Sequence, residues 1–257
     1  MNEYIIYEQP TAENIRNFLK CEYLYEKYNS TLAQEDIWGI KSSISTLLEM
    51  SDFCQRISLK LELLKELEKN ILYLDDLKNN DFIDLAKYDN FLTEVKRCIA
   101  NLNDIESSPS KSIVDNDFLM QIKNKLNVPA GDNFFDMPSY LNLLSSNKSS
   151  IVDTINLWCL PFNPLFESSK IILDIKRRNA KFEIFTSNKS FFEKKLDKVT
   201  KIDLVRIKLK KNINIFPDIS VNRQNINVIF KTSYGDSRLS RAISDNIEFE
   251  LSLSGIK

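Results

Sequence analysis

Residues 201–210 read Lys-Ile-Asp-Leu-Val-Arg-Ile-Lys-Leu-Lys, and this stretch predicts a β-strand with one apolar and one basic face. Successive side chains of a strand point to opposite faces, so residues two apart share a face. The apolar face carries Val205, Ile207 and Leu209. The opposite face carries Arg206, Lys208 and Lys210. Such a strand fits an antiparallel sheet that is buried on one side.

The same alternation continues toward the C-terminus. Apolar residues recur at every second position in residues 226–230 and again in residues 247–253. These segments predict further strands whose apolar faces meet in one core. The C-terminal part of the chain is therefore expected to form an antiparallel sheet or sandwich.

Before about residue 180 the apolar residues recur at helical spacing instead. One stripe consists of Leu61, Leu64, Leu67, Ile71 and Leu74, and another of Leu92, Val95, Ile99 and Leu102. A short strand is expected at residues 4–7, and Asn163-Pro164 begins a helix that ends in Lys176-Arg177-Arg178. The predicted fold class is α+β, with an α-helical domain at residues 11–179 and a β domain at residues 180–257.

The charge changes at the same boundary. Residues 1–179 carry 20 Lys and Arg against 27 Asp and Glu, whereas residues 180–257 carry 15 against 9. The two net charges, about −7 and +6, nearly cancel to the overall −1. A basic, strand-rich module attached to an acidic helical one is typical of proteins that bind an anionic partner.

The basic run itself allows two interpretations. Residues 176–211 hold 13 basic and 4 acidic residues, and the cations at 176–178 could simply compensate the dipole of a helix C-terminus. Similarly, the cations of the 201–210 strand could pair across the sheet with Glu248 and Glu250. Two acids cannot neutralise the whole run, so we favour a binding surface.

Several classes of site are not expected in this chain. It contains no histidine and only four dispersed glycines, which argues against His-dependent nucleophiles, most catalytic zinc sites and glycine-rich phosphate loops. The four cysteines are far apart in sequence, and we expect reduced, buried thiols in a cytoplasmic protein. No metal, cofactor or disulfide is predicted. The N-terminal residues fit neither a signal peptide nor a membrane span.

Several segments, in this order and spacing, resemble the ZapD family of bacterial cell-division proteins. The first is Tyr7-Glu8-Gln9-Pro10 with residues 15–22, followed by Glu62-Leu63-Leu64-Lys65-Glu66-Leu67-Glu68. The next are Pro129-Ala130-Gly131, Phe135-Asp136-Met137-Pro138 and Asn163-Pro164-Leu165. The last are Asp203-Leu204-Val205-Arg206-Ile207-Lys208-Leu209 and Phe216-Pro217-Asp218-Ile219-Ser220. No single segment is specific, but the ordered set is.

The resemblance implies a non-enzymatic factor that binds the C-terminal tail of the tubulin-like GTPase FtsZ. It also implies a homodimer that cross-links and bundles FtsZ protofilaments, in the cytoplasm at the midcell septum, without contact to the membrane. The N-terminal strand, residues 3–8, is expected to join the β domain. The proposed tail-binding cations are Arg56, Lys176, Arg177, Arg206, Lys208, Lys210, Arg223 and Lys231. Of these, Arg56, Arg177 and Arg206 are the leading candidates.

The sequence departs from the family in one relevant place. Where family members often carry basic residues in the strand after Phe216, this chain has Asn225 and Ile229, with Arg223 and Lys231 nearby. The alternative function is a nucleic-acid-binding module, because a basic surface with interleaved aromatics also suits a polyanion. The aromatics concerned are Phe182, Phe185, Phe191 and Phe192. The acidic half of the chain argues against that alternative.

Overall fold

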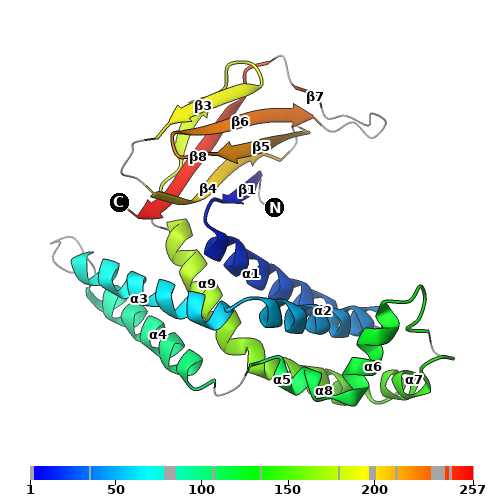
Figure 1. Ribbon diagram of the computed structural model, residues 1–257. Coiled ribbons are helices and arrows are strands. Elements are labelled where there is room, and N and C mark those ends of the chain that lie inside the picture. The colour runs from blue at the N-terminus through cyan, green and yellow to red at the C-terminus, as the bar shows by residue number, and fades with distance from the viewer. Residues whose placement is uncertain are drawn as a thin grey trace. The chain divides into compact units, whose positions relative to one another are not determined.

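The computed structural model describes most of the chain, which divides into two compact units (Figure 1). The described residues are 3–34, 36–77, 85–105, 108–133, 135–178, 180–196, 201–211, 214–232, 241–242 and 245–256. Residues 17–172 form a helical unit, whereas residues 1–16 and 173–257 form a β unit. The division falls within the first helix and within the last one.

The helical unit is built from short and long helices in direct succession. Its long helices are α1 (Glu13–Leu32), α2 (Ile37–Arg56), α3 (Leu59–Leu77), α4 (Leu85–Asn103) and α9 (Asn163–Arg178). The shorter ones are α5 (Lys111–Val114), α6 (Asp117–Leu126), α7 (Pro138–Leu144), α8 (Lys148–Cys159) and the 3-10 turn Leu160–Phe162. Helices α3 and α4 pack side by side as a hairpin (Figure 1).

Asx caps fix where α2 and α6 begin. The side chain of Asp36 accepts a hydrogen bond from the Gly39 amide at 2.6 Å, and this bond begins α2. Asn116 caps α6 in the same way through the Leu119 amide at 3.1 Å. Such a cap satisfies an amide that the helix leaves without a backbone partner. Local sequence thus sets the start of the two helices that matter for the site below.

The apolar stripes of the helical unit are partly displaced from those expected. Leu63 and Leu67 are buried, whereas Leu61, on the predicted stripe, is 56% exposed and lies outside the core. The helical core instead includes Phe18, Tyr28, Ile44, Leu47, Leu63, Leu67, Val95, Leu102, Ile155 and Phe162.

The β unit consists of two four-stranded antiparallel sheets. Sheet A has the order β1 (Tyr4–Pro10), β4 (Lys201–Lys210), β8 (Glu248–Ile256) and β2 (Glu183–Thr186). Sheet B has the order β3 (Phe191–Lys195), β6 (Asn225–Thr232) and β5 (Ile215–Val221), with β7 (Arg241–Ala242) also paired to β6. The predicted α+β class is therefore confirmed.

The N-terminal strand joins sheet A, as the resemblance implied. Strand β1 pairs antiparallel with β4, so that Tyr4 lies opposite Lys210 and Glu8 lies opposite Arg206. Figure 1 shows β1 beside β4, at the edge of the sheet. This pairing places the Glu8 carboxylate on the basic face of β4.

The two sheets enclose one apolar core, and the predicted inward faces supply it. Val205, Ile207 and Leu209 of β4 pack with Val228 and Phe230 of β6. Phe249 of β8 lies among three other rings: Phe185, Phe192 and Phe230. Strand alternation therefore predicted the core-facing side of β4, β6 and β8 correctly.

None of the helices in the described ranges combines the length and the apolar composition needed to cross a membrane.

Candidate binding surfaces

The eight predicted cations lie in three places. Arg56 is exposed at the end of α2, in the helical unit. Arg223 and Lys231 belong to sheet B and its β5–β6 turn. The outer face of sheet A, meaning the face turned away from the sandwich core, gathers Lys176, Arg177, Arg206, Lys208 and Lys210.

Glu8 is the centre of the cluster on that outer face. Arg177 donates to both Glu8 carboxylate oxygens, at 2.9 and 2.7 Å, and Arg206 Nε donates to Oε1 at 3.1 Å. Arg206 also donates to the Arg177 carbonyl at 3.0 Å. Two guanidinium groups thus share one carboxylate and tie the end of α9 to β1 and β4. Charge-assisted, bidentate bonds of this kind are among the strongest in proteins.

Two lysines of the outer face are also paired. Lys176 Nζ bonds the Asp203 carboxylate at 2.7 Å, and both side chains are almost fully buried. Lys208 Nζ bonds Glu250 at 2.9 Å, across the strands, and lies over the Tyr4 ring at 4.3 Å. For Lys208, the structure therefore contains the cross-strand ion pair with Glu250 that the sequence analysis gave as one of two interpretations.

The expectation that Arg206 projects from an exposed polar face is wrong, because Arg206 is only 9% exposed. Lys176, from the end of α9, is also buried, at 4%. Burial lowers the pKa of the Arg206 guanidinium from its usual value, and the Glu8 carboxylate acts in the opposite direction. The face is covered because the α9 end and Phe182 lie against it, with Arg206 4.9 Å from the Phe182 ring. Sequence counting missed Glu8 because it comes from a distant strand.

The remaining predicted cations of the β unit are scattered. Lys210 is exposed at the end of β4, and Arg223 is exposed in the β5–β6 turn. Lys231 pairs with Asp218 at 2.6 Å on the outside of sheet B. These three residues do not gather around a common cavity among those found in the described part of the chain.

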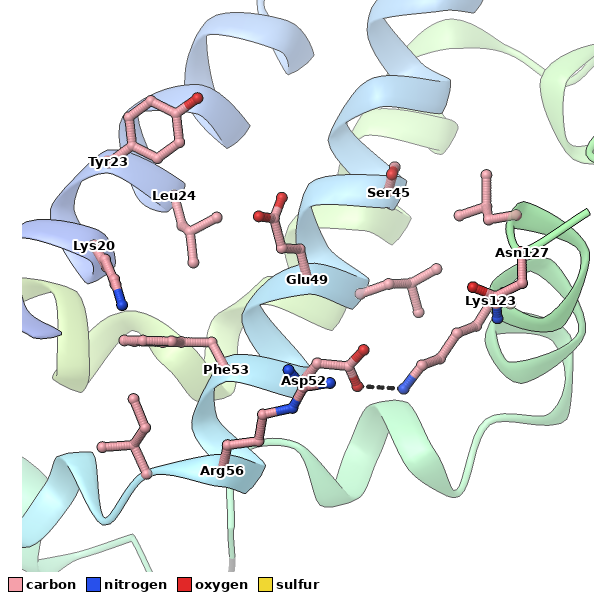
Figure 2. A pocket seen from close by; sticks show the side chains of 13 residues that line it. Lys20, Tyr23, Leu24, Ser45, Glu49, Asp52, Phe53, Arg56, Lys123 and Asn127 are labelled. Carbon is pink, nitrogen blue, oxygen red and sulfur yellow. Dashed lines mark hydrogen bonds and ion pairs between the residues drawn. The ribbon is translucent and has the colours of Figure 1, made fainter. Parts of the chain in front are cut away.

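Arg56, in contrast, lines an open hollow of about 710 Å³ between α1, α2 and α6. Figure 2 shows Lys20 and Leu24 on α1, Asp52 and Arg56 on α2, and Lys123 on α6 around this space. The floor is apolar and the rim is charged. The complete lining is Lys20, Tyr23, Leu24, Ser45, Leu48, Glu49, Asp52, Phe53, Arg56, Ile57, Lys123, Leu126 and Asn127.

The charges of the hollow leave a positive surplus. Asp52 pairs with Lys123, as the dashed line in Figure 2 marks, and Glu49 pairs with Lys27 at 2.9 Å. Both acids of the lining are therefore compensated. Among the described residues, neither Lys20 nor Arg56 has an acid within ion-pair distance. These two exposed cations remain available to an incoming carboxylate.

The hollow also offers apolar contact area. Tyr23 and Leu126 are exposed large side chains at its rim, 61% and 40%. Leu24 and Leu48 are buried beneath them. A short segment that combines apolar and acidic residues fits this arrangement, because its apolar side chains can bury while its carboxylates meet the two cations. Sequence analysis missed Lys20, because nothing in a helical pattern tells which exposed cation borders a hollow.

The aromatics that support the nucleic-acid alternative are mostly unavailable for base stacking. Phe185 and Phe192 pack against the sandwich core, and Phe182 lies against Arg206. Phe191 alone among the four is classed as exposed. The paired cations and the buried rings both weaken the case for a polyanion-binding face.

The cysteines are free thiols, and three of the four are buried. Burial raises the pKa of Cys159 to about 11 and that of Cys21 to about 12. Such thiols are poor nucleophiles at neutral pH. Within the described ranges, no group of three or more Cys, Asp or Glu side chains could hold a metal ion. These four residues therefore give no catalytic or metal site.

Comparison with known protein families gives one result. The family model of the cell division protein ZapD matches residues 19–229. The match covers most of the chain and extends across both compact units, from α1 to β6.

Proposed function

This chain belongs to the ZapD family of cell division proteins, and on that premise we propose that it binds the C-terminal tail of FtsZ. The protein would act without catalysis, as a division factor in the cytoplasm at the midcell septum. The observation that carries the proposal is the hollow of the helical unit, where two uncompensated cations border an apolar floor.

We place the tail in this hollow and not on the outer face of sheet A. The tail, as the resemblance describes it, combines acidic and apolar residues beyond a disordered linker. Lys20 and Arg56 would bind its carboxylates, and Tyr23 and Leu126 would cover its apolar side chains. The cations of sheet A are less suited, because Glu8, Asp203 and Glu250 already occupy most of them.

Charge reversal of the two available cations tests this placement. The double variant Lys20→Glu/Arg56→Glu should bind a fluorescent FtsZ tail peptide at least tenfold more weakly, about 1.4 kcal/mol. Lys96→Glu/Lys170→Glu is the matched control, because both lysines are exposed on other helices and outside the hollow. Equal binding by the folded test variant and the control would rule out the hollow as the tail site.

Bundling further requires two sites in one particle, and we propose that a homodimer supplies them. Each dimer would then hold tails from two filaments, and the flexible linkers would raise the effective concentration of tails. Light scattering should rise with added protein, pass through a maximum, and fall when separate dimers occupy each tail singly. An excess of free tail peptide should dissolve the bundles without depolymerising the filaments. Bundles that survive saturating peptide would exclude this mechanism.

A nucleic-acid-binding role predicts a different result in the same assays. Binding of single-stranded DNA by contacts to phosphates should fall steeply with salt and be indifferent to the FtsZ tail peptide. We expect neither strong DNA binding nor competition between DNA and the tail.

A further inference from the structure

Strand β1 forms one edge of sheet A, and among the described residues it pairs with β4 alone. Its backbone groups follow a strict alternation. The Lys211 amide donates to the Glu3 carbonyl at 2.8 Å, and the Thr11 amide donates to the Asp203 carbonyl at 3.0 Å. Glu3 and Thr11 thus mark the positions at which β1 bonds to β4. Hydrogen-bonded and non-bonded positions alternate along an antiparallel pair. The amides and carbonyls of the even positions Tyr4, Ile6 and Glu8 consequently point away from β4, toward the open edge.

Strand β1 carries the features that keep sheet edges from pairing only in its second half, at Glu8 and Pro10, and its first half lacks them. Natural edges are blunted by short length, charged residues or proline. Strand β3 ends in Glu193-Lys194-Lys195, β5 contains Pro217-Asp218, and β2 has only four residues. Strand β1 instead presents Tyr4-Ile5-Ile6-Tyr7 without a charge, and Ile6 is 44% exposed. Its single acid, Glu8, is bound by two arginines.

The charges beside this edge indicate which partner fits it. Lys210 lies opposite Tyr4 and is exposed, and the neighbouring Lys211 is exposed as well. Arg177, Arg206 and Lys208 are already paired with Glu8 and Glu250, so the exposed charges beside the edge are Lys210 and Lys211 against the acid Glu3. A second copy of the same edge would bring two such basic clusters together. An acidic strand would meet them with the complementary charge.

We propose that the β1 edge binds an extended segment of a partner protein in which apolar and acidic residues alternate. The segment would add to sheet A as a further strand, bonded to the backbone at Tyr4, Ile6 and Glu8. Its apolar residues would continue the face of Ile5 and Tyr7, and its acidic residues would lie on the opposite face, which carries Lys210. This surface goes beyond the proposed function, because it is a second docking site in the other compact unit and does not need the hollow.

The alternation of the amides provides a direct test. A short synthetic peptide of alternating valine and glutamate serves as the probe, and a valine–lysine peptide serves as its control. In the protein alone, the Tyr4, Ile6 and Glu8 amides should exchange with deuterium much faster than those of Ile5, Tyr7 and Gln9. The valine–glutamate peptide should slow the even amides selectively, and the valine–lysine peptide should not. Even amides that stay fast with saturating probe would overturn the proposal.

Single substitutions locate the binding on this edge. Ile6→Pro removes an amide that β4 does not use, so the fold is retained while the affinity for the probe should drop about tenfold. Ile6→Val keeps the amide and is the control, and Lys210→Glu should weaken binding of the acidic probe alone. Equal affinity in all three variants would contradict the proposal. Slowing of the even amides with rising protein concentration alone would show that a second copy is the occupant and would also refute the acidic partner. The Lys20→Glu/Arg56→Glu variant should bind the probe normally, which separates this test from that of the tail site.

Discussion

The two compact units of this protein differ in where their predicted binding cations lie and in how these cations are paired. The β unit buries charges as pairs, with Lys176 bonded to Asp203 and two arginines bonded to Glu8. The helical unit buries neutral thiols and keeps Lys20 and Arg56 uncompensated at an open rim. This difference shows that the number of Lys and Arg residues in a segment does not measure how much positive charge is available to a partner. Within the most basic segment, Lys176, Arg177, Arg206 and Lys208 are already bonded to acids.

The largest effect is expected from reversing a buried cation of the β unit. Arg206→Glu places a second carboxylate against Glu8 and leaves both without sufficient compensation. Loss of one member of a buried ion pair typically costs about 3–5 kcal/mol, and repulsion adds to this. Urea unfolding should therefore show a stability loss of at least about 3 kcal/mol. Lys210→Glu, on the same strand but exposed, should change stability by less than about 0.5 kcal/mol. Similar losses in the two variants would remove the distinction between the paired and the exposed cations.

A smaller effect is expected when the shared carboxylate is neutralised. Glu8→Gln retains the shape of the side chain but leaves Arg177 and Arg206 without their negative partner. Because these side chains are partly exposed, at 19% for Glu8 and 23% for Arg177, the loss should be about 2 kcal/mol. Double-mutant cycles between Glu8→Gln and Arg177→Gln should reveal coupling, because the two residues form one network. If the two losses of stability are additive, the contacts of Glu8 with the two arginines contribute only packing.

The stability of the helical unit should instead decrease at alkaline pH. Burial raises the pKa of Cys159 from 9.0 to about 11. A thiol whose pKa is raised on folding keeps its proton in the native state. Its contribution to the free energy of unfolding is therefore complete below about pH 9 and declines as the pH rises toward 11. Cys159→Ala should make the fall in stability between those pH values shallower, by about 1 kcal/mol at pH 10. An unchanged slope would show that this thiol is not held neutral by the fold.

The smallest effect on stability is expected at the hollow. Arg56→Glu should alter the free energy of unfolding by less than about 0.5 kcal/mol, because exposed charges contribute little. Thermal and urea unfolding can measure this difference. A loss close to that of Arg206→Glu would mean that Arg56 has a structural role, and the contrast between the units would fail.

Sequence periodicity predicted much of this fold because helix and strand repeats are local properties. The inward faces at Val205 and Phe230 and the helix that ends at Arg178 follow from spacing within one segment. The exposure of Arg206 did not follow, because it depends on Glu8, which is 198 positions away. The hollow was equally inaccessible from spacing, since α1, α2 and α6 all contribute to its wall. The prediction of Arg56 came from the family resemblance, and Lys20 came from the structure alone.

The pairing of β1 with β4 has a consequence for synthesis of the chain on the ribosome. Strand β1 is translated before the helical unit, whereas its partner β4 is made only after the whole helical unit has been translated. The segment Tyr4-Ile5-Ile6-Tyr7 is therefore unpaired until β4 has been made. The helices can fold during this time, because their contacts are more local in sequence. The sandwich can close only after β4 is made, around a strand that was made before the helices. During that interval the nascent chain exposes an apolar segment of high β-propensity, which is a suitable binding site for a chaperone.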